Sequence, residues 1–479
     1  MKRYLLLLSL FCSFITLSAA HCRIVGITDT HGAWRSTPKA NWLKIASALK
    51  ALPDDPPKIL IDCGDTLSGS REAAESDFTL GILALNQLHF DLWVPGNHDF
   101  DAGTGHLLKM TEIFEGTSLC SNFRGGRIRS WEVVSAGGFE IAFIGLLTPL
   151  TVNFRLFPEG IPEISGEKES VDRAMRELRE SGRPFDFAVL AMHRGRFTSG
   201  EKLYDILRGN PEIKLVLGGH SHVVEEAVQV RDVLFAAGGA HCEGFLDIDL
   251  RAPDENRSSP VITVICRETG KEPEDELFAA ALEKSLNLKT REELDRLVGV
   301  FSAPLKTAAY GRAASNFADM KLRAMLLDEG PGSVALTMVS TRKRDPVPPE
   351  ITEAGLFDLC PYQDSVTRFE VSRSELIDII NDRLKQGKKH HETPVLKGIR
   401  AYRDDSDTVI GITPEQDRYT LLISDFEAAG SGTAKSQTAA ILREKPFLIR
   451  GNLRDKIREL LSRSPVVTVK ASPWLFRQK

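Results

Sequence analysis

The chain has 479 residues, more than a single hydrophobic core usually supports, so two domains are expected. Hydrophobic residues make up 42% and charged residues 27%, the composition of a soluble globular protein. The formal net charge of -5 argues against a nucleic-acid-binding protein, which would need a basic face. A site for an anionic ligand would have to create its own positive charge, and metal ions are one means of doing so.

The N-terminus has the pattern of an export signal. Two basic residues precede an apolar run, Tyr4–Leu17, and small residues follow it up to Ala20. The run is shorter than a membrane-spanning helix, so we expect a signal peptide over residues 1–20 and no stable membrane insertion. The mature chain is expected in the periplasm or outside the cell. Lipid attachment at Cys22 is disfavoured, because His21 is bulky where lipoprotein signals have a small residue.

The first half of the chain alternates short apolar strands with amphipathic helices. Helices are expected at Phe78–Leu88 and Glu169–Arg179, and strands at Cys22–Ile27, Lys58–Asp62, Phe90–Val94, Phe139–Leu146, Phe185–Met192 and Ile213–Gly219. Strands without helices follow over Val223–Leu250, so the sheet is expected to be mixed. The pattern indicates a layered α/β fold.

A charged stretch, Pro273–Leu297, predicts a connecting helix at residues 273–299. It separates a catalytic domain, residues 21–272, from a smaller α/β domain, residues 300–479. Helices are expected in the second domain at Asn316–Leu327, Arg373–Leu384 and Leu453–Ser462.

Five polar clusters lie near the ends of the predicted strands. They are Asp29-Thr30-His31-Gly32, Cys63-Gly64-Asp65, Gly96-Asn97-His98-Asp99 with Asp101, His193, and Gly219-His220-Ser221-His222. Each alone has a plain structural interpretation as a helix cap, a turn or a buried histidine. Because ligands gather outside the carboxyl ends of strands in layered α/β proteins, the five together predict one site. Carboxylate, imidazole and amide ligands suit Zn²⁺, Mn²⁺ or Fe.

These clusters resemble the signature blocks of the calcineurin-like metallophosphoesterase family. The matching blocks, in order, are ITDTHG at Ile27–Gly32, GD at Gly64–Asp65, GNHDFD at Gly96–Asp101, the lone His193, and GGHSH at Gly218–His222. The chain is more specifically similar to the bacterial periplasmic 5′-nucleotidase and UDP-sugar hydrolase branch. The resemblance implies an αββα sandwich with a dinuclear metal site.

The resemblance also implies a role for each residue. One divalent ion would be held by Asp29, His31, Asp65 and His222, and the other by Asp65, Asn97, His193 and His220. His98 would lie near the leaving oxygen, where an imidazolium can protonate it, and Asp101 would orient its ring. Two cations a few ångströms apart can activate a shared water for in-line attack on phosphorus. His241, after a Gly-rich stretch, could also approach this site.

The second domain matches the branch in part. Tyr362, within Cys360–Ser365, and Phe426, within Ser424–Gly432, stand where the branch has two aromatic rings that sandwich a base. The usual ribose-binding Asp is missing, because Gly430-Ser431-Gly432-Thr433 replaces a Gly-Gly-Asp-Gly run. The usual Asn-Gly-Gly-Ile-Arg block is replaced by Ser340–Arg344. The arginines that could hold a phosphate are therefore Arg312, Arg342 and Arg344.

Three functions follow from these patterns. The first is a phosphoesterase for a small phosphorylated substrate, a 5′-nucleotide or a nucleotide sugar. The second is a phosphodiesterase or pyrophosphatase with a non-nucleotide substrate. The third is an exported binding protein without catalysis. Ordinary core aromatics and a solvated cationic loop remain the alternative interpretation of the second-domain residues.

Overall fold

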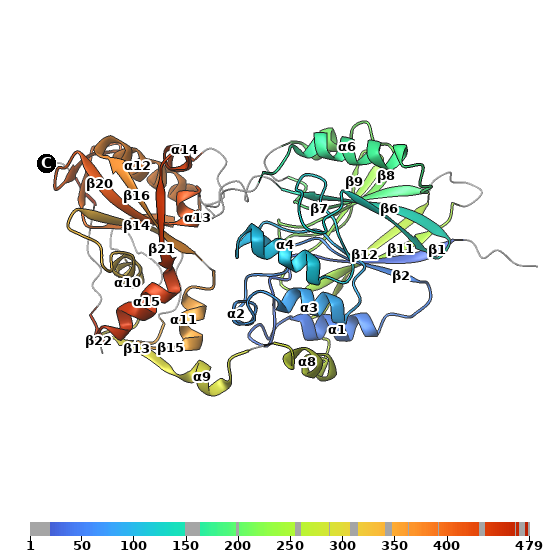
Figure 1. The fold of residues 1–479 in the computed structure, drawn as a ribbon, viewed down its shortest axis with the longest axis horizontal. Helices are drawn as coiled ribbons and strands as arrows, with labels where there is room; N and C mark the ends of the chain where they lie inside the picture. Colours follow the sequence, from blue (N-terminus) through green and yellow to red (C-terminus); the bar gives the residue numbers. More distant parts are fainter. Residues whose placement is uncertain are drawn as a thin grey trace, which may run out of the picture.

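The computed structural model describes most of the chain, namely residues 20–148, 163–197, 201–253, 260–286, 288–306, 315–340, 347–362, 364–390, 392–430, 436–464, 466–468 and 475–477. Figure 1 shows two bodies joined by a thin yellow segment, with the N-terminal body in blue to green and the C-terminal body in orange to red. Among the residues so described, no helix combines the length and the apolar character needed to cross a bilayer.

The N-terminal body contains two six-stranded sheets. The first has the order β12-β11-β1-β2-β3-β4, formed by Val261–Glu268, Gly244–Arg251, His21–Ile27, Lys58–Asp62, Leu92–Trp93 and Thr117–Ser118. The second has the order β5-β6-β7-β8-β10-β9, formed by Trp131–Ala136, Phe139–Leu147, Phe187–His193, Ile213–Gly218, Val233–Gly238 and Val224–Val230. Parallel strands form the middle of each sheet, and β11 and β9 pair antiparallel with their neighbours, so both sheets are mixed.

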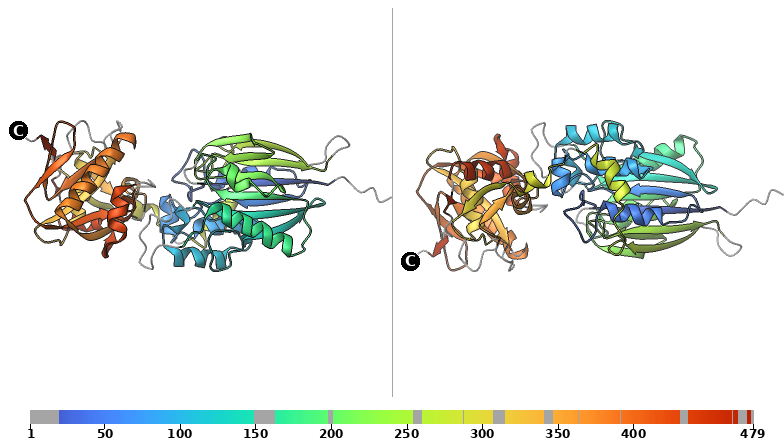
Figure 2. Two further views of the ribbon diagram at one scale, coloured as in Figure 1. Left: turned by 90° about the horizontal axis from the view of Figure 1, so that it is seen from above. Right: turned by 90° about the horizontal axis from the view of Figure 1, so that it is seen from below.

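The two sheets pack face to face between two layers of helices (Figure 2). Side chains alternate along β7: Val189 and Ala191 lie in the apolar cluster between the sheets, and Leu190 and Met192 lie in the cluster under the outer helices. The outer helices on that side are α6 (Glu167–Glu180) and α7 (Leu203–Leu207); those on the other side include α1 (Trp42–Lys50), α3 (Leu80–Gln87) and α4 (Thr104–Ile113). The expected αββα sandwich is confirmed.

The sequence of helix α6 explains why this helix packs as an outer layer on the sheet. Its buried residues Val171, Ala174, Met175 and Leu178 recur at spacings of three and four, which gives the helix one apolar stripe. That stripe packs on β6, while the charged residues of the helix lie on its other faces.

The segment Pro273–Leu297, predicted as one connecting helix, is instead two short helices and the start of a strand. They are α8 (Glu276–Glu283), α9 (Arg291–Asp295) and β13 (Leu297–Phe301). A separate helix begins after Thr290, because its side chain and that of Glu293 cap each other's backbone N–H groups. The two helices lie along the bottom of Figure 1, and α8 packs on α1 and α3.

The C-terminal body is built on a five-stranded sheet of order β17-β14-β20-β16-β21, formed by Glu392–Lys397, Ser333–Ser340, Arg418–Ser424, Ser365–Ser372 and Phe447–Asn452. Two three-stranded sheets flank it: β15 (Glu350–Thr352), β13 and β22 (Val466–Val467), and β19 (Val409–Thr413), β18 (Arg400–Arg403) and β23 (Leu475–Arg477). The helices are α10 (Asn316–Met325), α11 (Glu353–Leu359), α12 (Arg373–His390), α13 (Asp425–Ala428), α14 (Gln437–Arg443) and α15 (Leu453–Ser462). The three helices expected here are therefore present, with α12 continuing beyond Leu384.

Candidate metal centre

The polar clusters lie at the carboxyl ends of parallel strands from both sheets. Asp29 follows β1, Asp65 follows β2, and Asn97 follows β3 in the first sheet. His193 is the last residue of β7, and His220 follows β8 in the second sheet. Since parallel strands end at the same edge, the sandwich delivers all these side chains to one place.

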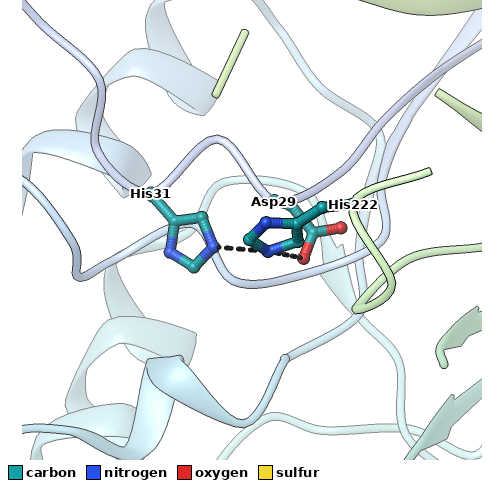
Figure 3. A group of neighbouring side chains, drawn as sticks. All are labelled: Asp29, His31 and His222. Atoms are coloured by element: carbon teal, nitrogen blue, oxygen red, sulfur yellow. Dashed lines mark hydrogen bonds and ion pairs between the residues drawn. The ribbon is translucent and has the colours of Figure 1, made fainter. Parts of the chain in front are cut away.

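A first group consists of Asp29, His31 and His222, whose donor atoms lie within 4.8 Å of one another. Figure 3 shows the two imidazoles and the carboxylate directed toward one another. His31 Nε2 is 3.1 Å from His222 Nε2, and His222 Nε2 is 3.3 Å from Asp29 Oδ1. Such a cluster of imidazole and carboxylate donors suits a borderline divalent cation.

A second group consists of Asp65, His193 and His220, also with donor atoms within 4.8 Å of one another. His193 Nε2 lies 3.1 Å from Asp65 Oδ2, and His220 Nδ1 lies 2.8 Å from Asn97 Oδ1. Asp65 Oδ2 is also 3.9 Å from His31 Nε2 in the first group. The Asp65 carboxylate therefore lies between the two groups.

The protonation chemistry of these side chains fits cations. Burial lowers the pKa of both His31 and His220 to about 4, so both rings are neutral at pH 7, the form that binds a metal. Burial also disfavours a charged His193, but the Asp65 and Asp29 carboxylates raise its pKa to about 10. The buried His193 Nε2 has no well-aligned hydrogen bond, although Asp65 Oδ2 lies 3.1 Å away. A divalent cation would displace the Nε2 proton of the charged imidazole and bind to this nitrogen.

The backbone is strained where it carries these groups. Asp29, His31, Asp65, His220 and His222 all have φ between +50° and +69°. This left-handed region is unfavourable for residues other than glycine, and such strain concentrates at functional sites.

Two glycines allow neighbouring loops to approach closely at the centre. A Cβ at Gly96 would lie 2.2 Å from Asp65 Oδ1, and one at Gly219 would lie 2.2 Å from Thr28 Oγ1.

Asp99 organises the loops around the centre, a role that the sequence analysis does not predict. Its carboxylate accepts the backbone N–H groups of Gly96, Asp65, Thr66 and Leu67 at 2.7–3.1 Å. It thus ties the loop after β2 to the loop after β3. The Asp99 side chain is buried, and burial together with the Asp65 charge raises its pKa to about 7. Its place two residues after Asn97 was the available signal.

His98 lies at the edge of the centre, in the short helix η1 (His98–Phe100). Its Nδ1 is 3.0 Å from Asp101 Oδ2, and its backbone N–H donates to Asp65 Oδ1 at 2.7 Å. Ser68 Oγ donates to the same Asp101 oxygen. Asp101 is buried and His98 is partly exposed. The aspartate is therefore placed to hold the ring and fix its orientation.

Tyr362 of the C-terminal body reaches this edge. Its ring centroid lies 6.0 Å from that of His98, with 24° between the planes. Arg454 fixes the turn that carries it, because the guanidinium donates to Cys360 O at 2.7 and 3.0 Å and to Pro361 O at 3.2 Å. The Arg454 guanidinium is buried and stacks over the Phe357 ring at 3.9 Å.

Of the other predicted substrate-binding residues, the structure describes only Phe426. Phe426 is exposed on α13, and the neighbouring Asp425 carboxylate accepts the backbone N–H of Ser365 at 3.1 Å. This bond holds the turn of Phe426 beside the strand that follows Tyr362. The candidate phosphate-binding residues Arg312, Arg342 and Arg344 lie outside the described residues.

His241 also lies at the centre. Its ring centroid is 5.0 Å from that of His31 and 5.3 Å from that of His222. Its backbone N–H donates to Asp29 O at 2.7 Å. It is not one of the residues whose donor atoms all lie within 4.8 Å of one another.

Comparisons with known proteins agree with this geometry. Residues 22–224 match the family model of the calcineurin-like phosphoesterases. The endonuclease YhcR of Bacillus subtilis is 22% identical over 434 residues, which is 81% of this chain and 34% of that protein. A 5′-nucleotidase of Vibrio vulnificus is 25% identical over 182 residues, 34% of this chain and 32% of that protein. The matches thus span about a third of the length of these curated relatives.

Solved structures share the whole fold. A 5′-nucleotidase precursor from Thermus thermophilus has a TM-score of 0.68 and 16% identity, covering 96% of this chain and 99% of that one. A 5′-nucleotidase from Candida albicans has a TM-score of 0.61 and 14% identity, covering 93% of this chain and 100% of that one. The chain therefore carries a calcineurin-like phosphoesterase domain and has the two-domain fold of these solved 5′-nucleotidases.

Proposed function

We propose that this chain is an exported, metal-dependent phosphoester hydrolase with two divalent ions, acting on a 5′-nucleotide or a nucleotide sugar. The observation that carries the proposal is the pair of donor groups, Asp29–His31–His222 and Asp65–His193–His220, with Asp65 between them. The signal peptide over residues 1–20, export, and the division into domains at residues 21–272 and 300–479 belong to the same proposal.

The chain's own residues supply positioning and proton transfer. Two bound cations supply positive charge for the phosphoryl oxygens and acidify a water for attack. When Nδ1–H of His98 donates to Asp101, the imidazolium form of the ring carries its second proton on Nε2. His98 can then pass that proton to the departing oxygen. Asp101 keeps the ring in that orientation and is held in turn by Ser68.

A nucleotide substrate is supported by the aromatic residues near His98. Tyr362 is about half exposed, and its ring lies near-parallel to the His98 ring. Phe426 supplies a second exposed ring in the same body. Flat aromatic faces bind bases by stacking with little dependence on base identity. The substrate would thus bridge the two bodies.

A phosphodiester substrate is the second candidate. It is favoured by the 434-residue similarity to a protein named as an endonuclease, which covers most of this chain. The net charge of -5 gives no general attraction to nucleic acid, so a small diester is the more suitable probe.

The test combines metal content with substrate profiling. The purified chain should bind two equivalents of Mn²⁺ and hydrolyse AMP, with activity lost in EDTA and restored by Mn²⁺. Asp65→Asn, which suits the same left-handed backbone, should lose more than 99% of kcat, whereas the exposed Asp54→Asn should not change it. Faster hydrolysis of a generic diester or of UDP-glucose than of AMP would favour the second candidate or the nucleotide-sugar substrate. A chain with no metal and no hydrolysis would leave only the binding-protein alternative.

A further inference from the structure

Neighbouring imidazole rings at the centre lie at similar distances from one another, and His241 is one of them. Within the two donor groups, the ring centroids of His31 and His222 are 5.1 Å apart, and those of His193 and His220 are 5.4 Å apart. The ring centroid of His241 lies 5.0 Å from that of His31 and 5.3 Å from that of His222, which are nearly the same distances. It therefore belongs to the imidazoles around the first group, although it is not one of the three residues whose donor atoms all lie within 4.8 Å of one another.

The position of His241 is built into the fold. Its backbone N–H binds Asp29 O at 2.7 Å, which ties the loop after β10 to the loop after β1. His241 and the next residue, Cys242, both have left-handed backbones, with φ of 52° and 59°. Maintaining two strained residues costs free energy, so the surrounding structure must fix this loop firmly. A histidine held in this way is poorly explained as a solvated surface residue.

His241 also faces open space. A groove of about 500 Å³ runs along one side of the centre, and its lining includes Lys39, His222, Glu226, His241, Glu243 and Glu268. His222 and His241 are both exposed and line this groove, so the groove reaches the first donor group. Lys39 is paired with Glu243 at 2.5 Å, so the lysine charge is already compensated. The imidazole of His241 is thus a hydrogen-bond donor that lines the groove beside the first donor group.

We propose that His241 binds the phosphoryl group of the substrate, donating a hydrogen bond to one of its oxygens from the groove side of the Asp29–His31–His222 site. This inference rests on the proposed function. It adds a substrate-binding residue from a segment that contributes no metal ligand to the two donor groups. His98 and Tyr362 would then face the leaving group, and His241 would face a non-bridging oxygen or the remaining substituent.

The test measures binding of inorganic phosphate, the common product, to the full chain loaded with Mn²⁺, by isothermal titration calorimetry. His241→Phe keeps a ring but no donor, and His241→Asn suits the left-handed backbone but is too short to reach. Both should weaken phosphate binding about tenfold, the loss of one hydrogen bond to a charged group. His106→Phe on α4, whose ring packs on Phe78, is the control and should bind phosphate like wild type.

Metal content separates the possible outcomes. Two Mn²⁺ ions per chain in wild type and in both His241 variants, with weakened phosphate binding, support the inference. Unchanged phosphate affinity in His241→Asn, with wild-type hydrolysis intact, overturns the inference and leaves the proposed function standing. Loss of one Mn²⁺ ion in the variants also overturns it, because His241 would then be a metal ligand. A wild-type chain that binds no Mn²⁺ refutes the proposed function and the inference together.

Discussion

Replacing Glu353 by glutamine tests how the C-terminal body is fixed to the connecting segment. The Glu353 carboxylate is about 3% exposed and lies 2.9 Å from Arg458, 3.0 Å from Arg296 and 3.5 Å from Lys289. Arg296 and Lys289 belong to the connecting segment, and Arg458 belongs to α15. Burial alone would raise the pKa of Glu353, but the arginines and the lysine lower it from 4.5 to about 2.

The magnitude follows from this shift. A carboxyl group whose pKa is 4.5 when unfolded and about 2 when folded adds about 3 kcal/mol to the free energy of unfolding at pH 7. Because the folded pKa is depressed, the contribution is complete above pH 4.5 and is lost as the pH falls toward 2. Glu353→Gln also leaves three cations close together. We therefore expect a loss of about 3 kcal/mol, or about 6–12 °C in Tm for a domain of this size.

Differential scanning calorimetry of the full chain checks this expectation. The gap in Tm between wild type and Glu353→Gln should be widest at pH 7 and should shrink by about half near pH 3. Glu350→Gln, three residues earlier on exposed β15, should leave the Tm unchanged at both pH values. A gap of equal size at pH 7 and pH 3 would show that packing, not charge, is responsible. No gap at pH 7 would refute the electrostatic reasoning.

Three further variants probe the site. Tyr362→Ala should raise KM for AMP at least tenfold while leaving the kcat for p-nitrophenyl phosphate, which has no base to stack, within twofold. Arg454→Met removes the donor to the Cys360 and Pro361 carbonyls, so it should raise the same KM and lower Tm, as steady-state kinetics and a thermal melt would show. Asp99→Asn keeps only one carbonyl oxygen to accept hydrogen bonds from four backbone N–H groups, which is at most half of the original acceptor capacity. Titration with Mn²⁺ should therefore show weaker binding, and Tm should fall. Wild-type Mn²⁺ affinity in this variant would contradict the role given to Asp99.

The sequence predicts the strands of the sandwich because each has a strong local signal. Buried runs such as Phe139–Leu147 are continuous apolar segments, typical of strands covered on both faces. The polar residues after them are equally local: Asp29, Asp65 and His220 follow strands by one to three residues, and parallel pairing then brings them together. Fold class and family could therefore be predicted from short segments alone.

Other features depend on contacts between distant segments. Asp99 acts through backbone N–H groups that any residue type would provide, so composition gives no signal for it. The ring of His241 meets His31 only because β10 and β11 return the chain to β1. The capping box at Thr290 was visible in the sequence, yet the surrounding charge pattern favoured a continuous helix. Here the local capping chemistry determined where the helix began.

The two bodies contribute different kinds of residues to the candidate site. The donor groups and the His98–Asp101 pair all belong to the N-terminal sandwich, where strand ends hold them. The residues that would select a leaving group, Tyr362 and Phe426, belong to the C-terminal body, where Arg454 and Asp425 fix their turns. Under the proposed function, a change in the second body should alter which leaving group is accepted while leaving the hydrolytic chemistry intact.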